Sequence, residues 1–150
     1  SDVEYTGVER KKGYEDALRT YGISAPEGYR VSGRHSFELG YQGMKRLLAM
    51  EEAPTAVILS YYDTTLGGIL ALDDTGMNCP EDISVIGFDD MLMSKVIRPK
   101  LWIVSQPMRE MSEKAVQMLL ARIGHLEAGG PVRVSFTASM RMRDSVKKLL

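Results

Sequence analysis

The sequence is poor in cysteine, in charge of one sign and in long hydrophobic runs, and each shortage excludes a class of protein. Its 150 residues contain a single cysteine, Cys79, so no disulfide can form within the chain, and a disulfide-stapled secreted scaffold is excluded. No apolar run reaches the roughly 18 residues of a transmembrane helix, and no charged-then-apolar leader opens the sequence. Lys and Arg total 19 against 20 Asp and Glu, a net charge of -1, so the basic excess of a nucleic-acid-binding surface is missing.

Motifs that carry enzyme chemistry are also missing. There is no G-x-S-x-G nucleophile elbow, and neither of the glycine-rich phosphate-binding patterns occurs. The only histidines, His35 and His125, belong to no metal-binding pattern and there is no cysteine pair, so no zinc site is expected. The Asp73-Asp74 and Asp89-Asp90 pairs fit turns or helix caps better than an acid–base pair. We therefore expect a protein that is not an enzyme and has no cofactor.

What is present is the composition of a globular domain, 44% hydrophobic and 26% charged, in which helical and extended patterns alternate. The helical patterns cover residues 8–20, 37–48, 63–75 and 108–123. Ser36 and Asp63 are predicted N-caps, and Gly22 and Gly76 are predicted ends. The extended patterns cover residues 29–32, 56–59, 83–88 and 133–142, the last with one exposed face. Because the apolar runs at 56–59 and 83–88 are nearly unbroken, the prediction is an α/β fold, an open parallel sheet with helices on both faces.

Polar and aromatic residues follow three of these strands, at 32–35, 61–63 and 89–90. Ligands of open α/β sheets bind at the carboxyl ends of the strands, where these loops would meet. Carboxylate and guanidinium groups hydrogen-bond neighbouring hydroxyls, and aromatic planes cover the apolar face of a ring. The pattern therefore indicates a binding site for a polyhydroxylated small molecule.

Several ordered motifs give the chain a family resemblance. They are Arg10-Lys11-Lys12-Gly13-Tyr14, the segment Pro80 with Asp82-Ile83-Ser84-Val85-Ile86-Gly87-Phe88-Asp89-Asp90, then Pro99-Lys100-Leu101, Gln106-Pro107 and Arg143-Asp144-Ser145. With these motifs, residues 6–145 resemble the effector-binding domain of LacI/GalR-family bacterial transcription regulators. The resemblance implies a periplasmic-binding-protein-like type I fold, of which this chain would be the C-terminal subdomain, itself incomplete.

The resemblance also implies roles for individual residues. The effector-binding positions are Thr6, Arg10, His35, Tyr62, Asp89 and Gln106. The implied homodimer interface uses the apolar helix at 63–75 and the segment at 91–97, through Leu66, Leu70, Met91 and Met93. Four positions depart from the family pattern. Tyr62 stands where a small polar residue is usual, Trp102 where threonine is, Leu66 where alanine is and Ser112 where glycine is.

The expected function follows from the same resemblance. Residues 1–150 would be part of the effector-binding and dimerisation domain of a cytoplasmic regulator, with a small molecule, expected to be a sugar, as effector. DNA would be bound only through a helix-turn-helix outside this chain, which also lacks the hinge and most of the first subdomain. Two alternatives are a sugar-binding component of a transport system with the same fold and an α/β enzyme, although no motif favours the enzyme.

Overall fold

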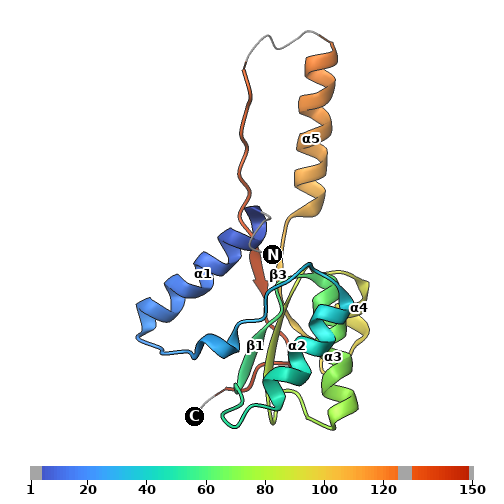
Figure 1. The fold of residues 1–150 in the computed structure, drawn as a ribbon. Coiled ribbons are helices and arrows are strands. Elements are labelled where there is room, and N and C mark those ends of the chain that lie inside the picture. Colours follow the sequence, from blue (N-terminus) through green and yellow to red (C-terminus); the bar gives the residue numbers. More distant parts are fainter. Residues whose placement is uncertain (1–4, 125–129, 149–150) are drawn as a thin grey trace.

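The computed structural model describes residues 5–124 and 130–148, so His125 and the start of the turn expected at Gly129 lie outside the described residues. A four-stranded sheet with the order β1-β2-β3-β4 lies at the centre (Figure 1). Its strands are β1 (Ala56–Ile58), β2 (Ser84–Phe88), β3 (Trp102–Ser105) and β4 (Ser139–Arg141). The first three are parallel, whereas β4 runs antiparallel to β3. The predicted open α/β sheet is therefore present, but it is mixed and not wholly parallel.

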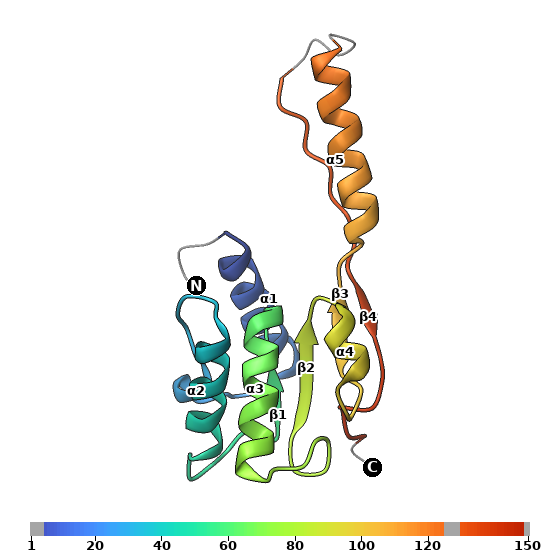
Figure 2. The same ribbon diagram turned by 90° about the vertical axis from the view of Figure 1, so that its right-hand side faces the viewer.

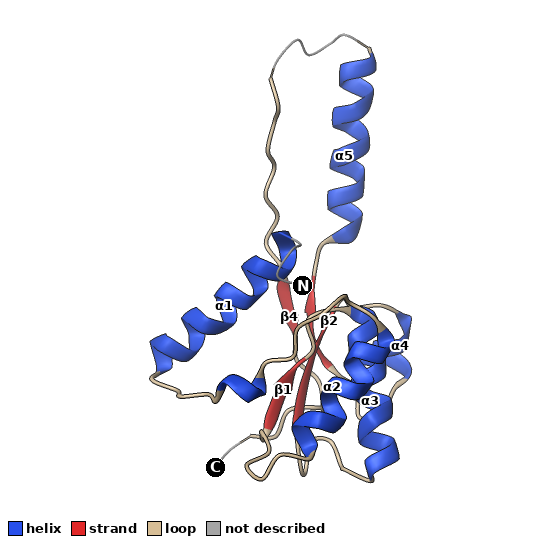
Figure 3. Ribbon diagram, in the orientation of Figure 1, coloured by secondary structure: helices blue, strands red, loops and turns tan. Residues whose placement is uncertain are grey.

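Helices flank the sheet on both sides, as predicted (Figure 3). They are α1 (Tyr5–Tyr21), α2 (Phe37–Leu48), α3 (Tyr62–Thr75), the short α4 (Leu92–Val96) and α5 (Met108–Ile123). Helices α2 and α3 lie side by side on one face, and α1 lies on the other side of the sheet (Figures 1 and 2). Helix α5 projects away from the sheet, and the chain returns beside it as an extended arm (Figure 2). Within the described residues, no helix is both long and apolar enough to cross a membrane.

Local signals set most helix ends. The Ser36 hydroxyl accepts a hydrogen bond from the Leu39 amide at 3.1 Å, so the predicted N-cap of α2 is confirmed. Gly22 and Gly76 have φ angles of +64° and +68°, the left-handed conformation that ends α1 and α3. The predicted cap of α3 is wrong: Tyr61 is the N-cap, and Asp63 lies inside the first turn.

The strand predicted at 29–32 is also wrong. A 3-10 turn covers Glu27–Tyr29, and the residues after it join no strand of the described sheet. The Arg46 guanidinium instead donates to the carbonyls of Gly28 and Arg30, at 2.9 and 2.8 Å. A side chain thus satisfies backbone groups that a neighbouring strand would otherwise hold.

The strand predicted at 133–142 is much shorter than its alternating pattern suggested. Only Ser139–Arg141 pairs with β3, and all three residues are exposed, so the expected buried face is absent. The preceding residues form the arm beside α5, beyond the end of the sheet (Figure 2). Their alternating apolar side chains have no core to face in the described structure.

The hydrophobic core lies between the sheet and the α2–α3 pair. Its buried members are Met44, Leu59, Ala71, Leu72, Ile83 and Val85. The two helices approach at glycines, since a Cβ at Gly67 would overlap the backbone of α2 at Phe37 and Tyr41. Helix α3 therefore packs on both the sheet and α2, and its Leu70 side chain stays 41% exposed.

Candidate functional site

The loops that leave β1, β2 and β3 bring the predicted ligand-binding side chains to one edge of the sheet. Tyr61 follows β1, Asp89 follows β2 and Gln106 follows β3. Arg10 reaches the same edge from α1, and His35 reaches it from the loop before α2. We call this edge, formed by the carboxyl ends of the parallel strands, the rim.

Arg10 is the group that ties α1 to the rim. Its guanidinium carbon lies 3.7 Å from the centre of the Phe88 ring and 4.3 Å from that of Tyr61. Nη1 also donates to the Ser60 carbonyl. Aromatic faces attract a cation, so Arg10 is held between β1 and β2 although α1 has no buried residue of its own.

Tyr61 connects the next two predicted residues. Its ring stacks on His35 with the ring centres 3.3 Å apart and the planes 25° from parallel. Its hydroxyl lies 2.9 Å from the Thr6 hydroxyl oxygen. Thr6, Arg10 and His35, which the resemblance named as separate contacts, therefore meet on one aromatic ring.

That ring belongs to the neighbour of the residue predicted from the sequence. Tyr62, the predicted contact, is the first residue of α3 and is half-buried. Tyr61 is still extended, with φ -150° and ψ 157°, and so continues the line of β1 past the sheet edge. The position of the helix start could have identified Tyr61. With Asp63 as the expected cap, the helix was expected to begin two residues later than it does.

Asp89 and Gln106 form the second group at the rim. Gln106 Nε2 donates to Asp89 Oδ1 at 2.7 Å, and the Asp89 amide donates to the Val104 carbonyl at 3.0 Å. Asp89 has a φ of +69°, the only positive value among non-glycine residues in the described chain. A strained backbone at a strand end is typical of residues that present a side chain to a ligand.

The rim offers side chains that can recognise a ligand. The carboxylate of Asp89 and the amide of Gln106 can bond neighbouring hydroxyls, and the stacked His35 and Tyr61 rings offer an apolar plane. In the part of the chain that the structure describes, no three His, Cys, Asp or Glu residues are grouped to hold a metal ion. The chemistry available is that of binding a polar ring.

The four residues predicted for a dimer interface lie on α3 and around α4. Leu66 is half-buried, whereas Leu70, Met91 and Met93 are exposed, Met91 by 52%. Two further apolar side chains of the predicted segment 91–97, Leu92 and Val96, are exposed on α4 by 73% and 58%. The exposed residues of α4 are therefore apolar apart from Lys95.

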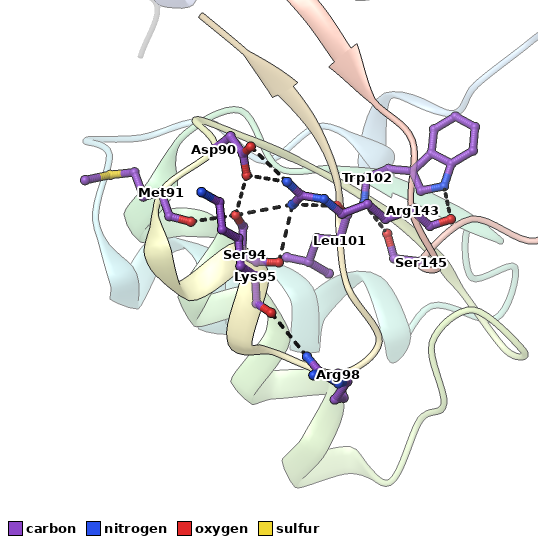
Figure 4. A network of polar contacts seen from close by, with 9 residues as sticks. All are labelled: Asp90, Met91, Ser94, Lys95, Arg98, Leu101, Trp102, Arg143 and Ser145. Atoms are coloured by element: carbon purple, nitrogen blue, oxygen red, sulfur yellow. Dashed lines mark hydrogen bonds and ion pairs between the residues drawn. The ribbon is translucent and has the colours of Figure 1, made fainter. Parts of the chain in front are cut away.

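A polar network beneath α4 was missed by the site prediction, although its residues stood in the quoted motifs (Figure 4). Arg143 Nη2 donates to both carboxylate oxygens of Asp90, at 2.7 and 2.8 Å. The Ser94 hydroxyl donates to Asp90 Oδ1 at 2.7 Å. Burial alone would raise the pKa of Asp90, but the hydrogen bonds from Ser94 and Arg143 and the charge of Arg143 outweigh it, and the pKa is lowered.

The network continues to β3. Ser145, fully buried, accepts from the Trp102 amide at 2.7 Å and donates to the Val85 carbonyl at 2.6 Å. The indole Nε1 of Trp102 donates to the Arg143 carbonyl at 2.9 Å. The Asp89-Asp90 and Arg143-Asp144-Ser145 motifs are therefore joined in space.

Comparison with known proteins agrees with this architecture. A family described as "Periplasmic binding protein-like domain" matches residues 1–146. The probable HTH-type transcriptional repressor ExuR of Bacillus subtilis is 40% identical over 141 residues, which cover 94% of this chain and 42% of that protein. The relatives named as repressors have a role that is not enzymatic.

Solved structures agree as well. The transcription regulator CcpA of Lactococcus lactis superposes with a TM-score of 0.87 at 26% identity, covering 98% of this chain and 53% of that one. A LacI-family regulator from Enterococcus faecium with bound ribose gives a TM-score of 0.79 at 29% identity, covering 91% and 50%. The chain thus spans about half the length of the proteins it resembles.

Proposed function

Since the chain belongs to the periplasmic binding protein-like family, in the form found in LacI-family transcription regulators, we propose that it is the effector-binding and dimerisation part of such a regulator. The observation that carries the proposal is the rim, where Arg10, Tyr61, Asp89 and Gln106 converge from α1 and from three strand ends. A binding rim without catalytic groups suits a protein that senses a metabolite and does not transform it.

The effector is proposed to be a sugar. Asp89 and Gln106 supply the acceptor and donor that ring hydroxyls need, and the stacked His35 and Tyr61 rings can lie against the apolar face of a pyranose or furanose. The bound ribose of the Enterococcus faecium regulator supports this class of ligand. Tyr62, Thr6 and Arg10 remain proposed contacts beside them.

The mechanism we propose is a shift between two pre-existing conformations. A sugar that binds one conformation more tightly, by about 1–3 kcal/mol, moves a homodimer toward it and changes its affinity for operator DNA. DNA contact is assigned to a part of the regulator outside these 150 residues, in keeping with the net charge of -1. Such a regulator acts in the cytoplasm and is not an enzyme.

The transport alternative is less well supported. The named relatives are transcriptional repressors, and the solved structures cited above are transcription regulators. No feature of the described chain favours a transport component over a regulator.

The proposal is tested by a thermal-shift screen of the intact protein against D-ribose, other pentoses and hexoses, and purines. A sugar that raises Tm should lose its effect in Asp89→Ala and Arg10→Ala, because each substitution removes a rim group. Arg109→Gln, on exposed α5 and paired only with Glu113, is the matched control and should keep the shift. A shift that survives both rim substitutions would place the site elsewhere, and a purine hit without a sugar hit would overturn the ligand class.

A further inference from the structure

The one buried residue of helix α4 is polar. Of its five residues only Ser94 is buried, while the apolar side chains of Leu92, Met93 and Val96 are 73%, 40% and 58% exposed. Apolar burial is the usual source of helix stability in proteins, and a five-residue helix has little of its own. The orientation of α4 therefore depends on what holds Ser94.

Ser94 is held by the carboxylate and the guanidinium of the network in Figure 4. Its hydroxyl donates to Asp90 at 2.7 Å, and Arg143 Nη1 lies 3.4 Å from both the hydroxyl and the carbonyl oxygen of Ser94. The side chains of Arg143 and Asp90 are only 18% and 14% exposed. Because one guanidinium nitrogen contacts both oxygens of the Asp90 carboxylate, the pair fixes orientation as well as distance.

The same carboxylate is bonded through the backbone to the ligand rim. Asp90 directly follows Asp89, whose side chain accepts from Gln106 and whose carbonyl accepts from the Met91 amide at 2.9 Å. Since the backbone of Asp89 has a φ of +69°, a change of its dihedral angles would move Asp90. The rim and the first turn of α4 are thus separated by one residue, which Arg143 anchors.

Arg143 is itself fixed to the sheet. Its carbonyl accepts from the Trp102 indole, and Nη1 lies 3.3 Å from the Leu101 carbonyl, so β3 holds it from two sides. Because the anchored guanidinium holds the Asp90 carboxylate, a change in the backbone of Asp89 and a change in the orientation of α4 must occur together.

We propose that Arg143 is a positioning residue that couples the conformation of Asp89 at the rim to the orientation of α4 and its apolar surface. This inference rests on the proposed function in one respect only, that the rim is a ligand-binding site. The coupling itself is a property of the Asp89-Asp90 strand end, Ser94 and Arg143.

The test is a double-mutant cycle without any ligand, read by amide hydrogen exchange in the intact protein. Gln106→Ala removes the rim contact to Asp89 and should raise exchange at the Ser94 and Met91 amides about threefold or more. In an Arg143→Gln background those amides should already exchange at least about tenfold faster, and Gln106→Ala should add nothing. The matched background is Arg98→Gln, which removes an arginine beside α4 that bonds only the carbonyls of residues 95–97. There the effect of Gln106→Ala should persist.

The proposal is overturned if Gln106→Ala leaves the α4 amides unchanged, or if its effect persists in the Arg143→Gln background. Should Arg143→Gln not fold, Arg143→Lys keeps the charge but has no second nitrogen to reach Ser94 and Leu101 while the first holds Asp90. Ser94→Ala opens the network from the α4 side. Each should remove the coupling. Because the cycle contains no sugar, failure to bind D-ribose or any other sugar would count against the proposed function alone.

Discussion

At the residue scale, the rim shows how aromatic rings can replace burial in fixing a charged side chain. Arg10 lies on a helix without buried residues, yet two ring faces and the Ser60 carbonyl hold it. A lysine at this position would keep the charge but lose the planar group that stacks on Phe88 and Tyr61. The geometry of the side chain, as well as its charge, is therefore part of the site.

Cys79 provides a residue-scale prediction of reactivity. Burial raises the pKa of its thiol to about 11, and Sγ also contacts the Ser145 carbonyl at 3.5 Å. Only the thiolate reacts, so at pH 8 the folded chain should react with Ellman's reagent about 100-fold more slowly than a free thiol, and faster as the pH rises. Stopped-flow absorbance checks this, with the urea-unfolded chain as control. Equal rates in the folded and unfolded chain would contradict the assigned environment.

The sequence predicted which kinds of side chain gather at the rim. Asp89 and Gln106 do meet, and Thr6, Arg10 and His35 gather on one ring. Tyr61 joins these residues without having been predicted, because the end of β1 and the start of α3 decide which tyrosine extends past the sheet. No sequence pattern revealed the Asp90–Arg143 pair, because 53 residues separate its members.

At the element scale, contact between α2 and α3 depends on the absence of side chains. Gly67→Ala should lower the free energy of unfolding by about 1–3 kcal/mol, because the added methyl would overlap the backbone of α2. The matched control is Gly13→Ala on α1, where nothing lies within 4 Å of the new Cβ. That change should stabilise the chain by up to about 1 kcal/mol, since alanine favours helix over glycine. Urea unfolding followed by circular dichroism separates them, and equal effects at the two sites would contradict the close helix contact.

Elements with strong local signals were predictable, and those that depend on distant partners were not. The bounds of α2 and α5 match their periodicity and flanking residues, and the end of α3 at Gly76 follows from glycine alone. The segment 29–32 has a strand-like composition, but the Arg30 carbonyl, like that of Gly28 just before it, accepts from Arg46. Helix α4 has no periodic pattern because its only inward residue is the polar Ser94.

At the scale of the whole molecule, a core on one face of the sheet contrasts with large apolar surfaces elsewhere. Helix α5 has no buried residue, and α4 carries exposed apolar side chains at Leu92, Met93 and Val96. Exposed apolar patches of this kind mark surfaces that associate with other protein. For the exposed apolar side chains of α3 and α4, the association we propose is the contact between two copies of this chain.

That association predicts how the oligomeric state responds to charge. Leu70→Lys and Met93→Lys each place a cation on the proposed interface. Together they should shift the intact protein from dimer to monomer and weaken self-association at least about 100-fold. The reason is that a symmetric contact would bury each unpaired charge twice. Tyr21→Lys, at a residue 78% exposed at the end of α1, should leave the dimer unchanged. Analytical ultracentrifugation over a concentration series distinguishes the two results. A dimer that persists in the double variant, with unchanged unfolding, would assign the interface to another surface, and a wild-type protein that remains monomeric at high concentration would remove the dimer from the proposed function.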